Sequence, residues 1–223
     1  MIAVLTADLI DSSLYKEDVL QQVLDTLTSE FGIITKQNGE KSVRFNIYRG
    51  DSFQGIVKSP EVALLIAIQI KAAVNRIHLK KTKKSRAYSK IADFKLAIGI
   101  GTQELEREAL SESNGQAFQF SGRSLDEMKN ENRKTRIKTP VEEIDAEFNT
   151  AFFLLDTITD KWSTASAEVV YFLLRGLKER EIAAEINISQ SAVNQRKKAA
   201  GWEAISGLLN RYQQVITTKL KNG

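Results

Sequence analysis

The order of strand-like and helix-like segments constrains the fold of this chain more than any other feature. Residues 2–7 form a short apolar run typical of a buried strand, and residues 19–31 place apolar side chains at helical spacing. An alternating hairpin pattern follows at 42–57, then an apolar helical segment at 61–77 and a second apolar strand at 94–101. This β-α-β-β-α-β order predicts a domain of class α+β.

The same order is that of the split unit in ferredoxin-like folds. The strand–helix alternation ends near Pro140, after one more helical segment and a short strand-like segment at 135–138. Beyond Pro140 the apolar spacing is helical throughout. The sequence therefore predicts a ferredoxin-like domain over 1–140, a connecting helix over 141–161 and an all-α domain over 162–223.

Composition limits the chemistry that the chain can perform. It has no cysteine and one histidine, which excludes disulfides, thiolate zinc sites, cysteine nucleophiles and multi-histidine metal sites. Any metal must therefore bind oxygen ligands, which favours Mg²⁺, Mn²⁺ or Ca²⁺. The longest apolar run, at 62–68, is too short to span a bilayer, and the N-terminus lacks the basic segment of a signal peptide. We expect a cytoplasmic protein without a membrane partner.

Two aspartates are predicted to meet at one edge of the sheet. In a β-α-β-β-α-β sheet, the first and third strands are antiparallel neighbours, so the end of one lies beside the start of the other. Asp8 ends the first strand and Asp51 precedes the third. Two carboxylates placed together repel each other unless one is protonated or both bind a divalent cation such as Mg²⁺ or Mn²⁺. The alternative, equally open, is that Asp8 caps a helix and Asp51 only forms the hairpin turn.

The residues around these aspartates suit a phosphate group. Asp11, Ser12 and Ser13 follow the first strand and are expected to open the next helix, whose first N–H groups can bind phosphate. Gly50 forms the hairpin turn, and Arg49 beside it supplies a cation. We therefore expect a nucleoside triphosphate or another nucleotide as the ligand.

The segment 179–201 has the pattern of two helices joined by a tight turn. Asn187 lies where the turn needs the left-handed conformation, and Ser189 is placed to cap the second helix. The expected apolar contacts between the helices come from Ile182, Ala183, Ile186, Ile188 and Val193. This is the helix-turn-helix pattern.

The second of these helices is expected to contact double-stranded DNA. Its amides can pair with base edges and its cations with phosphates. From Trp162 onward, nine Lys and Arg residues exceed five Asp and Glu residues, which places the excess positive charge in this part. The alternative is a solvated helical bundle, or a helix pair that contacts proteins. The expected DNA-contacting residues are Ser189, Gln190, Ser191, Asn194, Gln195, Arg196, Lys197 and Lys198.

Four segments, in order along the chain, resemble the catalytic domain of class III nucleotidyl cyclases, which shares its core with the GGDEF diguanylate cyclases. They are "TADLIDSS" (6–13), "YRGDSF" (48–53), "LAIGIGT" (96–102) and "GQAFQFSGR" (115–123). The resemblance implies that Gln119 and Arg123 contact the nucleotide and stabilise the transferring phosphates, and that the protein is a homodimer with sites at the interface. Two positions depart from the family, because Gln119 replaces an Asn and Ile47 replaces the adenine-selecting Lys.

The segment 163–214 resembles the helix-turn-helix module of sigma-factor region four and of bacterial response regulators, and the whole arrangement is similar to the SatD family of small bacterial proteins. The implied function is a bacterial DNA-binding transcriptional regulator with a cyclase-like, nucleotide-binding N-terminal domain, whether or not that domain is degenerate. One alternative is an active metal-dependent nucleotidyl cyclase that carries a helix-turn-helix module. A third is an adaptor whose two domains both bind proteins.

Overall fold

One five-stranded sheet organises the first part of the chain in the computed structural model, which describes residues 1–48, 50–78, 90–103 and 114–221. The strands are β1 (Ile2–Leu9), β2 (Val43–Tyr48), β3 (Ser52–Val57), β4 (Phe94–Gly101) and β5 (Thr135–Lys138). Their order across the sheet is β2-β3-β1-β4-β5. Strands β4 and β5 run parallel, whereas the other neighbouring pairs are antiparallel. The predicted antiparallel pairing of the first and third strands is confirmed.

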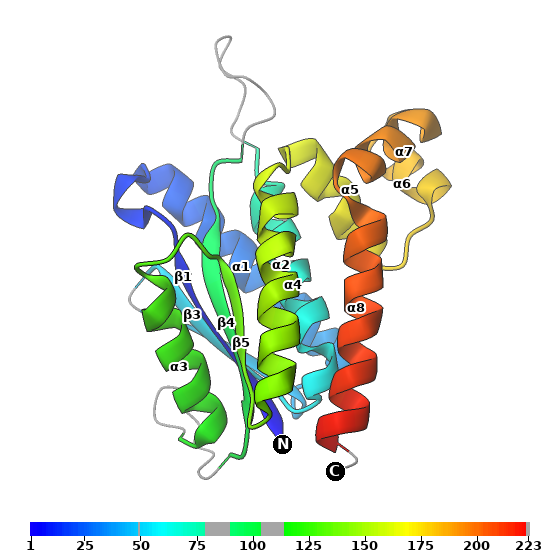
Figure 1. Cartoon of the computed structure of the whole chain (residues 1–223). Helices are drawn as coiled ribbons and strands as arrows, with labels where there is room; N and C mark the ends of the chain where they lie inside the picture. Colours follow the sequence, from blue (N-terminus) through cyan, green and yellow to red (C-terminus); the bar gives the residue numbers. More distant parts are fainter. Residues whose placement is uncertain (49, 79–89, 104–113, 222–223) are drawn as a thin grey trace.

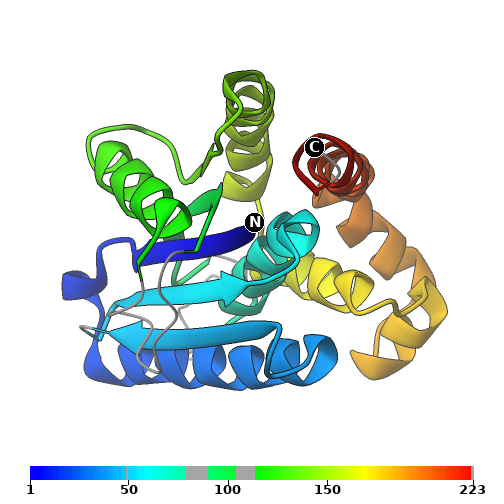
Figure 2. The ribbon, with the colours of Figure 1, turned by 90° about the horizontal axis from the view of Figure 1, so that it is seen from below.

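Helices cover both faces of this sheet, with α1 and α2 on one face and α3 on the other (Figures 1 and 2). The fold is therefore mixed α+β, as predicted. The helices are α1 (Glu17–Asn38), α2 (Ala63–Asn75), α3 (Gln116–Met128), α4 (Glu142–Asp160), α5 (Thr164–Leu174), α6 (Glu179–Glu185), α7 (Gln190–Ala199) and α8 (Trp202–Ile216). Two 3₁₀ turns lie at Ser12–Leu14 and Pro60–Val62, and a π-helical segment at Thr217–Lys221 follows α8.

In the described part of the chain, no helix has both the length and the apolar character needed to cross a bilayer.

Strand β1 lies at the centre of the sheet and is buried on both faces. Ala3, Leu5 and Ala7 point into the large core beneath α1 and α2. Val4, on the opposite face, packs with Ala117 of α3. A strand covered on both sides reads as a continuous apolar run, which is the pattern of residues 2–7.

Helix α3 lies directly on the backbone of β4 because Gly99 has no side chain. A Cβ atom on Gly99 would lie 2.2 Å from the carbonyl oxygen of Ala117 and 2.5 Å from the backbone nitrogen of Ser121. This close approach allows the Ser121 hydroxyl to accept a hydrogen bond of 2.9 Å from Thr6 on β1. The glycine thus sets how closely a polar side chain of α3 approaches the sheet.

Helix α2 is apolar around almost its whole circumference, and every one of its residues except Leu65 is buried. Such a helix must be covered on all sides. The sheet and α1 cover one side, and α5 and α8 cover another. One continuous core consequently runs from β1 through α2 and α4 to Leu220. The boundaries at residues 140 and 161 stay a prediction, and the buried core crosses both of them.

A buried glutamate joins three helices beside this core. Glu30 of α1 is 2% exposed. Gln69 of α2 donates to its Oε1 atom at 2.8 Å, while the Tyr171 hydroxyl and the Arg175 guanidinium donate to its Oε2 atom at 3.1 and 2.8 Å. Tyr171 lies on α5, and Arg175 is the residue directly after that helix. The hydrogen bonds to Glu30 therefore tie the C-terminal helices to the first part of the chain.

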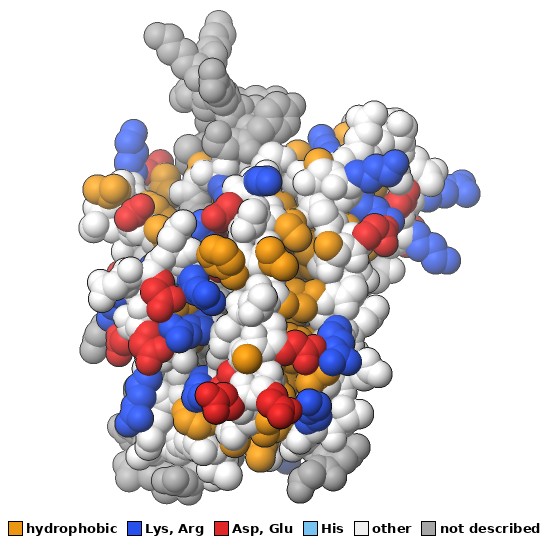
Figure 3. Space-filling view, viewed as in Figure 1, with side chains coloured by type: hydrophobic (Ala, Val, Ile, Leu, Met, Phe, Trp, Pro, Cys, Tyr) orange, Lys and Arg blue, Asp and Glu red, His pale blue; other side chains and the backbone are white. Residues whose placement is uncertain are grey.

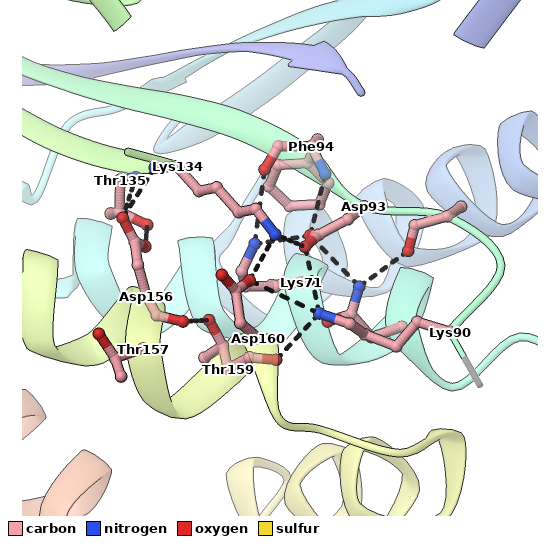
Figure 4. A network of polar contacts seen from close by, with 12 residues as sticks. Lys71, Lys90, Asp93, Phe94, Lys134, Thr135, Asp156, Thr157, Thr159 and Asp160 are labelled. Carbon is pink, nitrogen blue, oxygen red and sulfur yellow. Dashed lines mark hydrogen bonds and ion pairs between the residues drawn. The ribbon is translucent and has the colours of Figure 1, made fainter. Parts of the chain in front are cut away.

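Asp93, at the start of β4, is surrounded by three lysines (Figure 4). The Nζ atoms of Lys71, Lys90 and Lys134 lie 2.7, 3.3 and 3.1 Å from its carboxylate oxygens. Burial opposes ionisation of Asp93, but the three lysines outweigh burial and hold the pKa of Asp93 well below its usual range. Lys90 also donates to the carbonyl of Thr159 at 2.9 Å, so the cluster fastens the end of α4 to the sheet.

We predict that Asp93→Asn lowers the free energy of unfolding at pH 7 by about 3 kcal/mol, because it leaves the buried Lys71 and the partly buried Lys90 and Lys134 without their counter-charge. Since the native pKa of Asp93 is depressed, its carboxylate stabilises the fold above the unfolded-state pKa of about 3.9, and this contribution declines as the pH falls below that value. The stability difference between wild type and variant should therefore shrink from pH 6 to pH 3, measured by urea denaturation. Asp126→Asn is the control, since Asp126 pairs with Lys129 on the surface. A difference that is independent of pH would contradict the assignment.

We predict that Glu30→Gln lowers the free energy of unfolding by about 2–4 kcal/mol, because Arg175 loses a buried charged partner. Amide hydrogen exchange should accelerate more in α5, α6 and α7 than in β1, since the contact holds these helices to α1 and α2. Glu40→Gln, on an exposed residue after α1, serves as the control. Unchanged exchange in α5–α7 would show that other contacts hold the C-terminal helices in place.

Candidate functional site

The end of β1 and the turn between β2 and β3 meet at one edge of the sheet. Asp8 lies opposite Ser52 in the strand register, and the backbone N–H of Leu9 donates to the carbonyl of Asp51 at 2.9 Å. The Ser52 hydroxyl donates to Asp8 Oδ1 at 2.6 Å and lies 3.3 Å from Asp51 Oδ1. The two carboxylates that the sequence singled out therefore flank one hydroxyl group.

The hydrogen bonds around this pair leave one carboxylate oxygen without a described donor. Ser12 donates to Asp51 Oδ2 at 2.9 Å, and no described residue donates to Asp8 Oδ2. Because Ser52 has a single proton, its hydroxyl can donate to only one of the two carboxylates at a time. Within the described ranges, no Lys or Arg forms an ion pair with Asp8 or Asp51. Two half-buried carboxylates that form no ion pair with a described residue are suited to a divalent metal, although Lys95 lies opposite Asp8 in the strand register.

The donor set fits a metal that is shared with a phosphate ligand. Among the residues that the structure describes, no three His, Cys, Asp or Glu side chains are grouped as a metal site. Mg²⁺ in proteins is commonly held by one or two carboxylates together with substrate phosphates and water. Asp8 and Asp51 provide that number of carboxylates, so phosphate oxygens would have to complete the coordination.

The prediction that Asp11, Ser12 and Ser13 open the following helix is wrong. They form a 3₁₀ turn, with Asp11 in the left-handed conformation at φ 54°, and α1 begins later, at Glu17. The first turn of α1 carries Glu17 and Asp18, which would repel a phosphate. The reason is local: the Leu14 N–H donates to the Asp11 carbonyl, so the chain closes a short turn before the helix starts.

The hairpin turn lies at Gly50, as predicted. Gly50 has a φ of 77°, which other residues rarely adopt. Arg49, the predicted cation beside the turn, lies outside the described residues.

Gln119 and Arg123 are not brought to the acid pair within this chain. Both are exposed on the outward face of α3, while Ser121 between them points toward the sheet. Residues 119 and 123 are four apart and share one helix face, as the family resemblance requires. In the described part of the chain, neither side chain forms a hydrogen bond or ion pair with Asp8 or Asp51.

Sequence reasoning missed the polar side chains that β1 and β3 present on the α3 side of the sheet. Ser52 and Gln54 are two residues apart in β3, so they lie on the same face as Asp8 and Thr6 across the register. The alternation of "SFQGIV" contained this signal, because its polar residues occupy every second position up to Gln54.

The turn between α6 and α7 has the geometry that the sequence predicts. Asn187 has a φ of 52°, and the Ser189 side chain accepts a hydrogen bond of 3.1 Å from the N–H of Ala192. Ile182 and Val193 are fully buried against Val169 of α5. The two helices are therefore held at a fixed angle by a small core of their own.

The outward face of α7 is polar and partly cationic. In Figure 3, Lys and Arg side chains gather over α6 and α7, with acidic side chains among them. Of the eight residues predicted to contact DNA, five are exposed, namely Ser189, Gln190, Ser191, Gln195 and Lys198. The other three, Asn194, Arg196 and Lys197, are half-buried.

Two of the three predicted phosphate-binding cations pair with acids of the same chain. Arg196 lies 3.5 Å from Glu168, and Lys197 lies 3.3 Å from Glu179 and 2.9 Å from Glu203. The hydrogen bond to Glu203 raises the pKa of Lys197. Lys198 has no acidic partner among the described residues. The positive charge available to an anionic partner is thus smaller than the sequence suggests.

A scan against models of protein families and a search of curated proteins found no match. Among solved structures, the GGDEF domain of DgcB from Caulobacter crescentus, in complex with c-di-GMP, is 15% identical with a TM-score of 0.41, covering 62% of this chain and 77% of that one. The active GGEEF domain of a diguanylate cyclase from Vibrio cholerae is 14% identical with a TM-score of 0.41, covering 62% and 81%. A bacterial light-regulated adenylyl cyclase is 12% identical with a TM-score of 0.42, covering 61% and 74%. These are likenesses of fold over part of the chain.

Proposed function

We propose that the chain is a bacterial DNA-binding regulator whose sheet edge binds a nucleotide with a divalent metal and whose α6–α7 pair binds double-stranded DNA. The observation that carries the proposal is the polar, exposed face of α7, mounted on a tight turn at Asn187 and a cap at Ser189. A helix held in this way presents its first turns to a groove, which is how helix-turn-helix proteins contact bases.

Some residues of α7 are proposed to contact DNA bases, and others to contact the DNA phosphates. Gln190 and Gln195 are exposed amides, and a glutamine can pair with adenine through two hydrogen bonds. Ser191 and Asn194 flank them, and Lys198 is placed to contact a phosphate. The Ser189 hydroxyl is already used for capping, so this residue orients the helix. Arg196 and Lys197 would have to exchange their acidic partners for phosphates.

The sheet edge is proposed to bind a nucleoside triphosphate or another nucleotide. Asp8 and Asp51 would hold Mg²⁺ or Mn²⁺ together with phosphate oxygens, and Ser12, Ser13, Asp11 and Gly50 border the same turn. This assignment makes residues 1–140 a ferredoxin-like, cyclase-type domain.

A homodimer is part of the proposal because Gln119 and Arg123 are exposed and form no described contact with Asp8 or Asp51 of their own chain. A second copy could place them over the first copy's nucleotide. It would also pair two α7 helices for a two-fold symmetric DNA site.

The second candidate is an active nucleotidyl cyclase, favoured by the convergence of Asp8 and Asp51 on Ser52. In that reaction a 3′-hydroxyl attacks the α-phosphorus and pyrophosphate leaves; a bound metal would help ionise the hydroxyl and neutralise the phosphates. Arg123 of a second copy would stabilise the transferring charge. Against it, Ile47 occupies the position of the family's base-selecting Lys and packs against the core beneath the sheet. We therefore place regulation first.

We predict that the full chain binds double-stranded DNA, detected by gel shift with genomic fragments at several salt concentrations, and that binding weakens as salt rises. Gln195→Ala should cost about 1–3 kcal/mol and relax the sequence preference, as expected for loss of an amide–base contact. Lys198→Ala should weaken binding to all DNA sequences equally. It should also reduce the slope of log K against log salt concentration by about one. Glu203→Gln should strengthen binding, because it removes one of the two acidic partners of Lys197 and leaves Glu179.

Lys36→Ala is the matched control for Lys198→Ala, since Lys36 is an exposed lysine on α1, far from α7 along the chain. Absence of binding to any fragment at low salt would overturn the DNA half of the proposal. Equal effects of Lys36→Ala and Lys198→Ala would show that binding is diffuse and does not use α7.

We predict that Asp8→Asn and Asp51→Asn each weaken nucleoside triphosphate binding in Mg²⁺ by about tenfold or more, because each removes a charge that holds the metal. Asparagine keeps an oxygen that can accept from Ser52, so the hairpin should remain intact. Calorimetry with each triphosphate measures the effect, and Asp25→Asn on the exposed face of α1 is the control. Mass spectrometry after incubation with Mn²⁺ tests the cyclase: a cyclic product that Asp51→Ala abolishes would place the second candidate first.

A further inference from the structure

A chain of hydrogen bonds runs across the sheet face beside the acid pair and ends at a backbone carbonyl. Gln54 Nε2 donates to Thr6 Oγ1 at 3.2 Å, and Thr6 Oγ1 donates to Ser121 Oγ at 2.9 Å. Ser121 Oγ donates in turn to the carbonyl of Phe118 at 3.1 Å. Thr6 is 5% exposed and Ser121 is fully buried, so water does not compete for the bond between them.

One direction of this chain forms more hydrogen bonds than the reverse. The carbonyl of Phe118 can only accept, so its bond to Ser121 forms only when the single proton of Ser121 points to it. In that direction the proton of Thr6 points to Ser121, which leaves Thr6 Oγ1 as an acceptor for Gln54. The amide of Gln54 is therefore oriented with its nitrogen inward and its oxygen outward. The amide of a surface glutamine is usually free to invert. Here the chain of hydrogen bonds from Gln54 through Thr6 to Ser121, called the relay, selects one orientation.

The outward edge of Gln54 has unused hydrogen-bonding capacity. No described residue donates to its Oε1 atom, and the side chain is only half-buried. Asn46 lies opposite Gln54 on β2 and is exposed, so a second amide borders the same surface.

These amides lie at a suitable separation from the acid pair. Thr6 and Gln54 form one cross-strand row, and Asp8 and Ser52 form the next row on the same face. Two residues along a strand correspond to about 7 Å. A ligand whose phosphates meet a metal at Asp8 and Asp51 would therefore place its base near Gln54.

We propose that Gln54 selects the base of the bound nucleotide, and that Thr6 and Ser121 are positioning residues that fix its amide. The outward edge offers an acceptor, Oε1, beside the second N–H of the amide. It is complementary to a base edge that carries an amino donor next to a ring acceptor, as adenine and cytosine do and hypoxanthine and uracil do not. The preferred ligand class is a nucleotide whose base carries such an edge, with ATP as its representative. This inference rests on the proposed nucleotide site and adds its specificity.

The test is calorimetry on the full chain in Mg²⁺ with ATP, ITP, which lacks the amino group of adenine, and inorganic tripolyphosphate, which lacks a base. Wild type should prefer ATP to ITP on the order of tenfold, as for one bidentate amide contact. Gln54→Leu should abolish that preference and leave tripolyphosphate affinity unchanged.

Ser121→Ala provides the sharper variant because Ser121 does not touch the ligand. Without Ser121, the Thr6 proton turns to Gln54 Oε1, and the amide inverts to present its NH₂ group. The ATP-to-ITP preference should then fall or reverse, whereas a merely structural loss would weaken both ligands alike. Thr6→Val, which removes the hydroxyl at constant shape, should also reduce the preference, and it keeps the test valid if Ser121→Ala does not fold.

The outcomes separate this inference from the proposal on which it rests. If wild type binds neither triphosphates nor tripolyphosphate, the nucleotide site itself is wrong and the base selection falls with it. If ATP and ITP bind equally, or if Gln54→Leu and Ser121→Ala leave their ratio unchanged, the site stands and the role of Gln54 is overturned.

Discussion

A helix that is buried on every side forces the two parts of this chain together. Nearly all of α2 is hidden from water, and a single sheet cannot cover more than one side of it. The helices after Pro140 supply the missing cover, which makes one core out of two predicted domains. Glu30 and Arg175 reinforce the same contact just before α6 begins. The proposed DNA-binding helices are consequently attached to the sheet through packed side chains, in addition to the covalent link through α4.

The contrast between the buried and the edge carboxylates is informative. Asp93 has three lysines around it and Glu30 has Arg175, so their charges are compensated inside the fold. Among the residues that the structure describes, Asp8 and Asp51 bond through their side chains only to the hydroxyls of Ser52 and Ser12. Carboxylates placed together without a cation are unfavourable, which is why this edge, and not the larger cluster around Asp93, is the candidate metal site.

The two proposed sites treat their ligands' negative charge in opposite ways. At the sheet edge the protein presents acids and requires a metal to neutralise phosphates. On α7 it presents cations, but it has already paired Arg196 and Lys197 with nearby glutamates. A phosphate backbone must displace those acids, which lowers affinity and increases the weight of the uncharged contacts from Gln190 and Gln195. If α7 binds DNA as proposed, this arrangement favours selective over nonspecific binding.

Local spacing and chain topology were enough to determine the strand pairing, the meeting of Asp8 with Asp51, the left-handed turn at Asn187 and the cap at Ser189. These features depend on neighbours in sequence or on the order of elements. Tertiary structure alone decided the shared core, the outward direction of Arg123, the pairing of Lys197 with Glu203, and the late start of α1 at Glu17. It also decided the relay from Gln54 to Ser121. Those features depend on how a helix is rotated about its axis and on partners as distant as Thr6 and Ser121, and no local periodicity encodes either.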